Sequence, residues 1–368
     1  MLALTVDVEE DMPNWRITDP ITVSNVQALP RLAELCSRHG ARPTYLCTYP
    51  AVTQASSAAI LRDLHERGDC EIGTHLHAWN TPPFHAVPGR KGDERGHTYY
   101  QFELGAEQFR SKLVVLHAAI TDLTGTPPLS FRAGRFGIDA ATLRELIPLG
   151  YEVDSSVTPL SEDRADRGPD FRSAPQYPYR PSHDDVGKRG SPQIIEIPVS
   201  VGLTRRLPAA LQNAYVRLPK ITHMRGLLSR DYLGLVDFAW LYPARFDLDL
   251  MLGAARTLVA GGAPILNIFL HSSELVHGQS LRVHDRASVE QVFKRLDGLL
   301  AACLREFDAE PCTLIEAGCR LQPGLGIAAL RLRTSPNVTV PGSFAGTVPG
   351  SIPTPLVPGS FAAHRYVQ

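Results

Sequence analysis

Apolar residues along this chain recur at two different spacings. Short apolar or alternating runs predict strands at 2–8, 43–48, 70–77, 129–133, 151–154, 194–199, 264–271 and 311–315. Apolar residues three and four apart predict helices at 25–39, 56–67, 102–123, 138–147, 205–232, 248–260 and 286–305. Because strands and helices take turns along the chain, we expect an α/β protein with a parallel sheet or barrel.

Two segments depart from this rhythm. Residues 158–192 hold many Pro, Arg, Asp and Ser residues without periodicity, which predicts a long inserted loop. The segment 333–368 repeats Val-Pro-Gly-Ser three times. Proline removes a hydrogen-bond donor and glycine adds chain entropy, so we expect a disordered tail. The expected organisation is one barrel domain over 1–325, followed by this low-complexity tail.

Composition excludes several classes of partner. The net charge is −1 and basic residues are spread along the chain, so we expect no nucleic acid partner and no anionic membrane surface. No apolar run approaches the roughly 18 residues of a membrane span. The six cysteines show no Cys-x-x-Cys spacing and no signal peptide is recognisable, so we expect a cytoplasmic protein with reduced thiols. Nothing in the pattern indicates the oligomeric state.

Potential metal ligands stand at the ends of two predicted strands. Asp7 and Glu9 are two residues apart, as are His75 and His77. Residues two apart on a strand point to the same face. Parallel barrels place their active sites at the carboxyl ends of the strands, where another predicted strand delivers His271. Carboxylates and imidazoles that meet in this way predict a zinc-type site.

The motifs that contain these residues resemble those of a known family. They are Leu4–Glu9 (LTVDVE), Glu71–His75 (EIGTH), Phe131–Phe136 (FRAGRF), Tyr151–Ser156 (YEVDSS) and Phe269–His271 (FLH). They occur in the order of the polysaccharide deacetylase motifs (the NodB-homology, carbohydrate esterase type). The resemblance covers roughly residues 2 to 315. It implies a distorted (β/α)7-type barrel and metal-dependent hydrolysis of an acyl group on a carbohydrate.

The resemblance also implies roles for individual residues. Asp7 matches the catalytic base, Arg132 the arginine that holds this base, and His271 the general acid. Glu9 and His75 match metal ligands.

Further positions are predicted to contact the substrate. Asp154 lies in the motif that lines the site, and Phe136 ends the arginine motif. Glu274, three residues after His271, either orients that imidazole or is an ordinary helix-start carboxylate.

The chain departs from the family pattern at two ligand positions. The second histidine of the family lies four residues after the first, where this chain has Trp79. His77 is the expected substitute because it shares a strand face with His75, and His85 and His97 are the next candidates. The carboxylate ligand is Glu9, not an aspartate adjacent to the base. Trp79 is expected to be either a core aromatic or a platform for the sugar.

Three functions remain open at this point. The first is a deacetylase of an N-acetylated sugar or glycan intermediate, with Zn²⁺ as the default cofactor and cobalt, nickel or manganese as alternatives. The second is an amidase acting on a small non-peptide C–N bond. The third is a catalytically silent barrel that binds glycan.

Overall fold

The computed structural model describes residues 1–13, 20–86, 100–191, 193–218 and 235–322. Its centre is a parallel sheet of seven strands in the order β6-β5-β4-β3-β2-β1-β9. These strands are β1 (Leu2–Val8), β2 (Thr44–Cys47), β3 (Glu71–Leu76), β4 (Ser130–Ala133), β5 (Val153–Asp154), β6 (Ile195–Glu196) and β9 (Leu266–His271). A separate antiparallel pair joins β7 (Val201–Leu203) to β8 (Phe238–Trp240).

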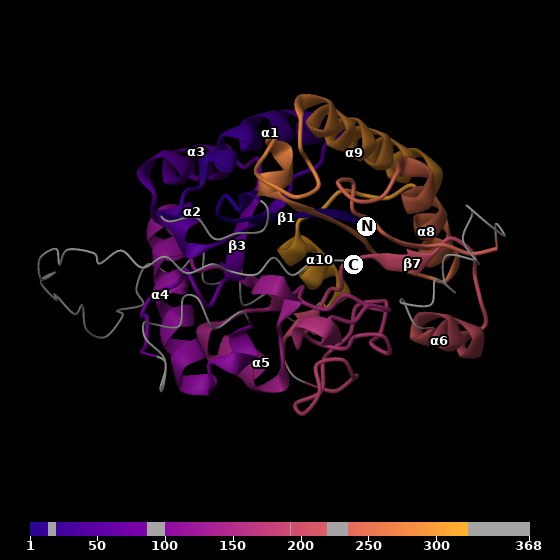
Figure 1. The fold of residues 1–368 in the computed structure, drawn as a ribbon, viewed down its shortest axis with the longest axis horizontal. Coiled ribbons are helices and arrows are strands. Elements are labelled where there is room, and N and C mark those ends of the chain that lie inside the picture. Colours follow the sequence, from indigo (N-terminus) through magenta and orange to yellow (C-terminus); the bar gives the residue numbers. More distant parts are fainter. Residues whose placement is uncertain (14–19, 87–99, 192, 219–234, 323–368) are drawn as a thin grey trace, which may run out of the picture. The chain divides into compact units, whose positions relative to one another are not determined.

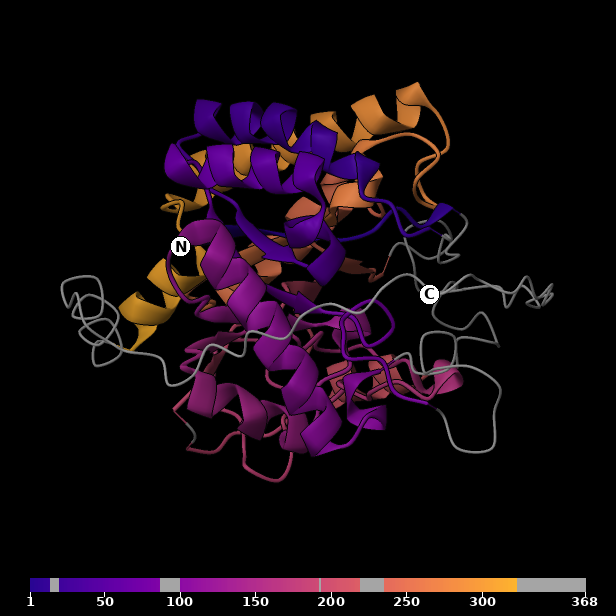
Figure 2. The same cartoon turned by 90° about the vertical axis from the view of Figure 1, so that its left-hand side faces the viewer.

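Helices surround the outer side of this sheet (Figure 1). They are α1 (Leu29–Arg38), α2 (Tyr49–Thr53), α3 (Ala55–Glu66), α4 (Ala106–Thr124), α5 (Ala140–Leu146), α8 (Leu248–Ala260) and α9 (Arg286–Phe307). Two further helices are α6 (Ala209–Arg217), which follows β7, and α10 (Leu314–Leu321), which packs against interior residues of the sheet. Short 3-10 turns include η2 (Ser24–Ala28), η5 (Gly134–Phe136) and η8 (Ser272–Leu275). The turned view shows α4 crossing in front of the strands (Figure 2). Among the described residues, no helix is both long enough and apolar enough to cross a membrane.

Hydrogen bonds of individual residues, and not strand pairing, connect the two edges of the curled sheet. β6 and β9 do not pair as strands, but Ser200 N donates to Asn267 O at 3.0 Å. Leu241 N donates to Ser200 O, and Phe269 N donates to Leu241 O, both at 2.9 Å. Ser200 and Leu241 therefore bridge the gap between the two edge strands. The predicted distorted (β/α)7 barrel is confirmed.

The alternation along β1 sorts its side chains into two environments. Leu4, Val6 and Val8 join the large core beneath the surrounding helices. Ala3 points the other way, into a small second core of interior strand residues and α10 residues such as Leu314. Further along β1, beyond this small core, the residues on the same inner face are polar. The parity of the strand thus directs the chemically active side chains into the barrel.

Most predicted elements are present with small shifts of their ends, and helix 248–260 matches α8. The predicted helix 25–39 is divided, because η2 precedes α1 and Pro30 lies in the first turn of α1. The predicted strand 311–315 is wrong. Thr313 caps α10 there, since its hydroxyl accepts from Glu316 N and its own N–H donates to the Glu316 carboxylate.

Some predictions concern segments that the structure describes only in part. Within 158–191 the chain forms one 3-10 turn and isolated β-bridges. The predicted helix 205–232 contains α6, and its remainder from 219 lies outside the described residues. The tail 333–368 also lies outside them. The β7–β8 pair is an addition that periodicity did not indicate.

Candidate active site

Four predicted site residues meet at the carboxyl ends of β1 and β3. Asp7 and His75 lie on the strands, and Glu9 and His77 follow directly after them. All four side chains are buried, with exposed fractions between 1% and 3%. Through β2, the register places Val8 level with Thr74, so the residues that follow them, Glu9 and His75, reach the same level of the barrel.

Glu9, His75 and His77 form a compact group of potential ligands. His77 Nε2 lies 3.4 Å and His75 Nε2 lies 3.8 Å from Glu9 Oε2. The two Nε2 atoms are 3.0 Å apart. One ligand atom of each residue falls within 4.8 Å of the others, as binding a single metal ion requires. The substitution of the second histidine by His77, predicted from strand parity, is geometrically possible.

Both imidazoles make their hydrogen bonds to other residues through Nδ1, so the Nε2 atoms are available to bind a metal ion. His75 Nδ1 donates to the Arg132 carbonyl oxygen at 3.0 Å, and this oxygen can only accept. His77 Nδ1 lies 3.0 Å from Glu10 Oε1. Glu9 Oε1 is buried and has no hydrogen-bond partner among the described residues. A buried unpaired carboxylate oxygen beside two imidazole lone pairs fits a divalent cation.

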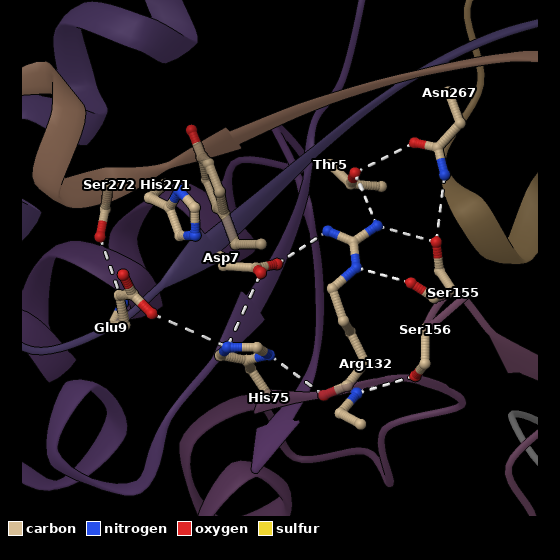
Figure 3. Close-up of polar contacts among 12 residues, drawn as sticks. Thr5, Asp7, Glu9, His75, Arg132, Ser155, Ser156, Asn267, His271 and Ser272 are labelled. Atoms are coloured by element: carbon tan, nitrogen blue, oxygen red, sulfur yellow. Dashed lines mark hydrogen bonds and ion pairs between the residues drawn. The ribbon is translucent and has the colours of Figure 1, made fainter. Parts of the chain in front are cut away.

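Arg132 holds Asp7 beside this group. Its Nη1 donates to Asp7 Oδ1 at 2.7 Å, and the guanidinium is fully buried (Figure 3). Burial by itself would raise the pKa of Asp7. The positive charge of Arg132, with a smaller contribution from His75, outweighs it and lowers the pKa. Asp7 is therefore ionised and held through one oxygen.

A buried polar network fixes Arg132 in turn (Figure 3). Nη2 donates to Thr5 Oγ1 at 2.9 Å and to Ser155 Oγ at 2.8 Å, and Nε donates to Ser155 O at 2.7 Å. Asn267 Nδ2 donates to Ser155 Oγ at 3.1 Å, while Asn267 Oδ1 accepts from Thr5 at 3.0 Å. The sequence reasoning missed this network, although Asn267 signals it as the one amide in an apolar strand.

His271 occupies the more open side of the site, with a side chain 14% exposed. Its Nδ1 lies 3.1 Å from the Tyr242 hydroxyl, which itself donates to Glu274. Glu274 Oε2 accepts from His271 N at 3.0 Å in a capping box at the start of η8, and it lies 3.4 Å from His271 Nδ1, so the structure is consistent with both expected roles of Glu274. Burial opposes protonation, but the charges of Glu9 and Glu274 raise the pKa of His271 to about 9. Tyr242 was not identified from the sequence.

The three predicted substrate contacts lie in different environments. Trp79 is 3% exposed, and its ring packs 4.1 Å from that of His77. This burial supports the core interpretation and not a sugar platform. Phe136 is partly exposed and lies 5.2 Å from the Phe269 ring, beside the site.

Asp154 lies on the wrong strand face for its predicted substrate contact. It is the register partner of Phe131, which belongs to the outer core, whereas the neighbouring Ser155 faces Arg132. Asp154 is fully buried and paired in register with Glu196. Burial raises its pKa to about 6. The structure thus gives no support to a substrate contact at Asp154.

The two alternative candidate ligands, His85 and His97, are not found in the described site. His85 is half-buried and takes no part in a described ligand group. His97 lies outside the described residues. Gly134, by contrast, is an unpredicted contributor. A β-carbon at this position would lie 2.5 Å from His77 Cδ2, so only glycine leaves room for this ring.

Comparisons with known proteins identify the fold. No protein-family model matches the chain, and no curated protein matches it by sequence. Its structure is similar to a protein from Mycobacterium smegmatis provisionally described as a polysaccharide deacetylase, with a TM-score of 0.51, 15% identity, and coverage of 93% of this chain and 94% of that chain. A second similar structure is from Parabacteroides distasonis, provisionally described as a glycoside hydrolase/deacetylase (TM-score 0.53, 14% identity, coverage 86% and 70%). At these identities, the similarity shows a shared fold.

Proposed function

From the NodB-type polysaccharide deacetylase fold of this chain, we propose that it is a metal-dependent hydrolase that removes an acetyl group from an N-acetylated sugar or glycan intermediate. One observation carries the proposal. Glu9, His75 and His77 converge beside an Asp7 carboxylate that Arg132 keeps ionised. A ligand group alone is common in proteins, whereas a ligand group beside a held base and a second acid–base residue forms a hydrolytic site.

The proposed cofactor is Zn²⁺, because two imidazoles and one carboxylate leave a coordination position open. When bound, such a cation lowers the pKa of water and polarises the acyl carbonyl. Asp7 Oδ1 is taken by Arg132, so Oδ2 is the oxygen that accepts the proton of the attacking water. Arg132 thereby orients the base and keeps it charged before the reaction.

His271 completes the proton balance of the reaction. Water adds to the acyl carbon, the C–N bond breaks, and the amine nitrogen needs a proton to leave. His271 supplies it, because the neighbouring Glu274 carboxylate favours the protonated imidazole. The products are acetate and a free amino sugar. Asp7 then loses its proton to solvent and His271 takes one up, which returns both groups to their initial states.

The test is acetate release from N-acetylglucosamine oligomers. We expect turnover by the wild-type protein, its loss after chelation and its return on adding zinc. Asp7→Asn should reduce kcat by roughly a hundredfold or more while metal binding persists. Asp285→Asn changes an exposed helix cap on α9 and serves as the matched control.

Two results would redirect the proposal. Undiminished turnover by Asp7→Asn would remove Asp7 from the role of base. Ammonia release from small cyclic or linear amides, without acetate from sugars, would favour the amidase function at the same site.

A further inference from the structure

Behind His77 lies a buried carboxylate that the proposed mechanism does not use. Glu10 is fully buried and follows directly after the ligand Glu9. Its Oε1 lies 3.0 Å from His77 Nδ1 and accepts from Trp79 Nε1 at 2.6 Å. Its Oε2 accepts from Asn80 Nδ2 at 2.7 Å. One carboxylate therefore gathers three groups from the segment that follows β3.

The neighbours of Glu10 determine which atom of His77 carries the proton. The Trp79 indole can only donate. The Asn80 amide nitrogen also donates, because its oxygen accepts from Thr81 Oγ1 at 3.2 Å. Glu10 is thus an acceptor on both oxygens. His77 Nδ1–H completes the set, which leaves the lone pair of His77 Nε2 directed at Glu9 and His75.

Trp79 occupies the position where the family pattern has its second histidine. Here its indole nitrogen holds Glu10 and its ring covers one face of His77, at 4.1 Å and a tilt of 33°. His75, by comparison, is held by a backbone carbonyl. A carboxylate partner raises the basicity of a ligating imidazole more than a carbonyl does and fixes its orientation.

We propose that Glu10, held in place by Trp79 and Asn80, is the positioning residue that makes His77 a metal ligand in this chain. The inference rests on the metal site of the proposed function and adds to it the residues that hold the ligand His77 in place. It assigns Trp79 to ligand support, and it explains how a histidine two residues after the first replaces one four residues after it.

Zinc affinity tests this proposal without any substrate. Purified apoprotein is titrated with zinc in competition with a chromophoric chelator. We expect Glu10→Gln to weaken binding about 10- to 100-fold, because the amide keeps the shape but loses the charge. Trp79→Phe keeps the ring and removes only the donor, and we expect a smaller loss in the same direction.

A matched control is Glu71→Gln. Glu71 is another enclosed carboxylate with several donors, including Ile315 N at 3.0 Å, but it lies at the opposite end of β3. We expect its zinc affinity to equal that of the wild type. A second readout needs no metal. The ¹⁵N shifts of His77, recorded in alkaline buffer that keeps the imidazole neutral, should report the Nδ1–H tautomer in the wild-type apoprotein and a mixture of tautomers in Glu10→Gln.

The outcomes separate the two proposals. Zinc binding by the wild type with unchanged affinity in both Glu10→Gln and Trp79→Phe would overturn the role of Glu10 and leave the proposed function standing. The absence of zinc binding in the wild type would overturn both. If Glu10→Gln does not fold, Trp79→Phe and the His77 tautomer in the wild type decide the question.

Discussion

Each reactive side chain in this site depends on a partner that holds one of its atoms. Arg132 occupies one oxygen of Asp7, and Tyr242 contacts the Nδ1 atom of His271. The remaining atom of each reactive group is thereby directed toward the ligand group. Orientation of this kind lowers a barrier because the reacting atoms need not be ordered in the transition state.

Tyr242→Phe tests the orientation of His271. The Tyr242 hydroxyl gives its only proton to Glu274, so its oxygen accepts from His271 Nδ1–H and leaves Nε2 for the substrate. Without the hydroxyl we expect kcat for deacetylation to fall roughly ten- to a hundredfold, with little change in KM. Steady-state kinetics on N-acetylglucosamine oligomers measure both.

Tyr177→Phe is the control, because that hydroxyl donates to the Leu258 backbone oxygen near the end of α8. A rise in KM with unchanged kcat in Tyr242→Phe would instead indicate that Tyr242 binds substrate.

At the scale of elements, the turn after β4 controls how closely the ligand segment can approach. η5 begins at Gly134, and Arg135 and Phe136 follow with φ values of 54° and 57°. Two successive non-glycine residues in this left-handed region cost about 1–3 kcal/mol each. Such strain persists only where the surrounding structure imposes it. Here Gly134 abuts His77, and Phe136 packs against the interior residue Phe269.

Gly134→Ala is therefore expected to displace His77. The added β-carbon would lie 2.5 Å from His77 Cδ2 and 2.6 Å from the Leu76 carbonyl, so the ring or the turn must move. We expect zinc affinity to fall by roughly tenfold or more, as measured by chelator competition. Gly187→Ala, in the irregular segment before β6, should bind zinc like the wild type. Equal affinity in Gly134→Ala would contradict the inference that Gly134 holds His77 in its ligand position.

At the scale of the whole molecule, a pair of buried acids links stability to pH. Asp154 and Glu196 are register partners on β5 and β6, and both are fully buried. Burial raises the pKa of Asp154 to about 6, and burial together with Asp154 raises that of Glu196 well above its ordinary value. The native state therefore holds protons that the unfolded chain has already lost. These acids lower the free energy of unfolding as pH rises from about 4 through about 6 and above.

Glu196→Gln should remove part of this pH dependence. A glutamine oxygen can still accept from Val157 N, so the packing is kept while the like charge is lost. We expect the free energy of unfolding of the variant to exceed that of the wild type by more at about pH 7.5 than at about pH 5. The two margins should differ by on the order of 1–2 kcal/mol. Urea unfolding at the two pH values gives this difference. A gain that is equal at both would contradict proton linkage as its cause.

Strand parity and residue chemistry together determined much of this protein from sequence alone. The period of two placed Asp7 with Glu9 and His75 with His77, because a strand has only two faces. The same rule indicates His77 as the substitute ligand. The barrel follows from the alternation of strands and helices, which leaves a parallel sheet few other ways to bury both faces.

The tertiary structure alone decided which residues support these ligands. Glu10 and Trp79 are 69 residues apart in the chain, Tyr242 and His271 are 29 apart, and Arg132 and Thr5 are 127 apart. Parity says which face a side chain occupies but not what lies opposite it. It could not show that the register turns Asp154 outward, or that Trp79 is buried behind His77. Such contacts depend on how the strands stagger and curl, because the energy of a hydrogen bond depends on the positions of both partners.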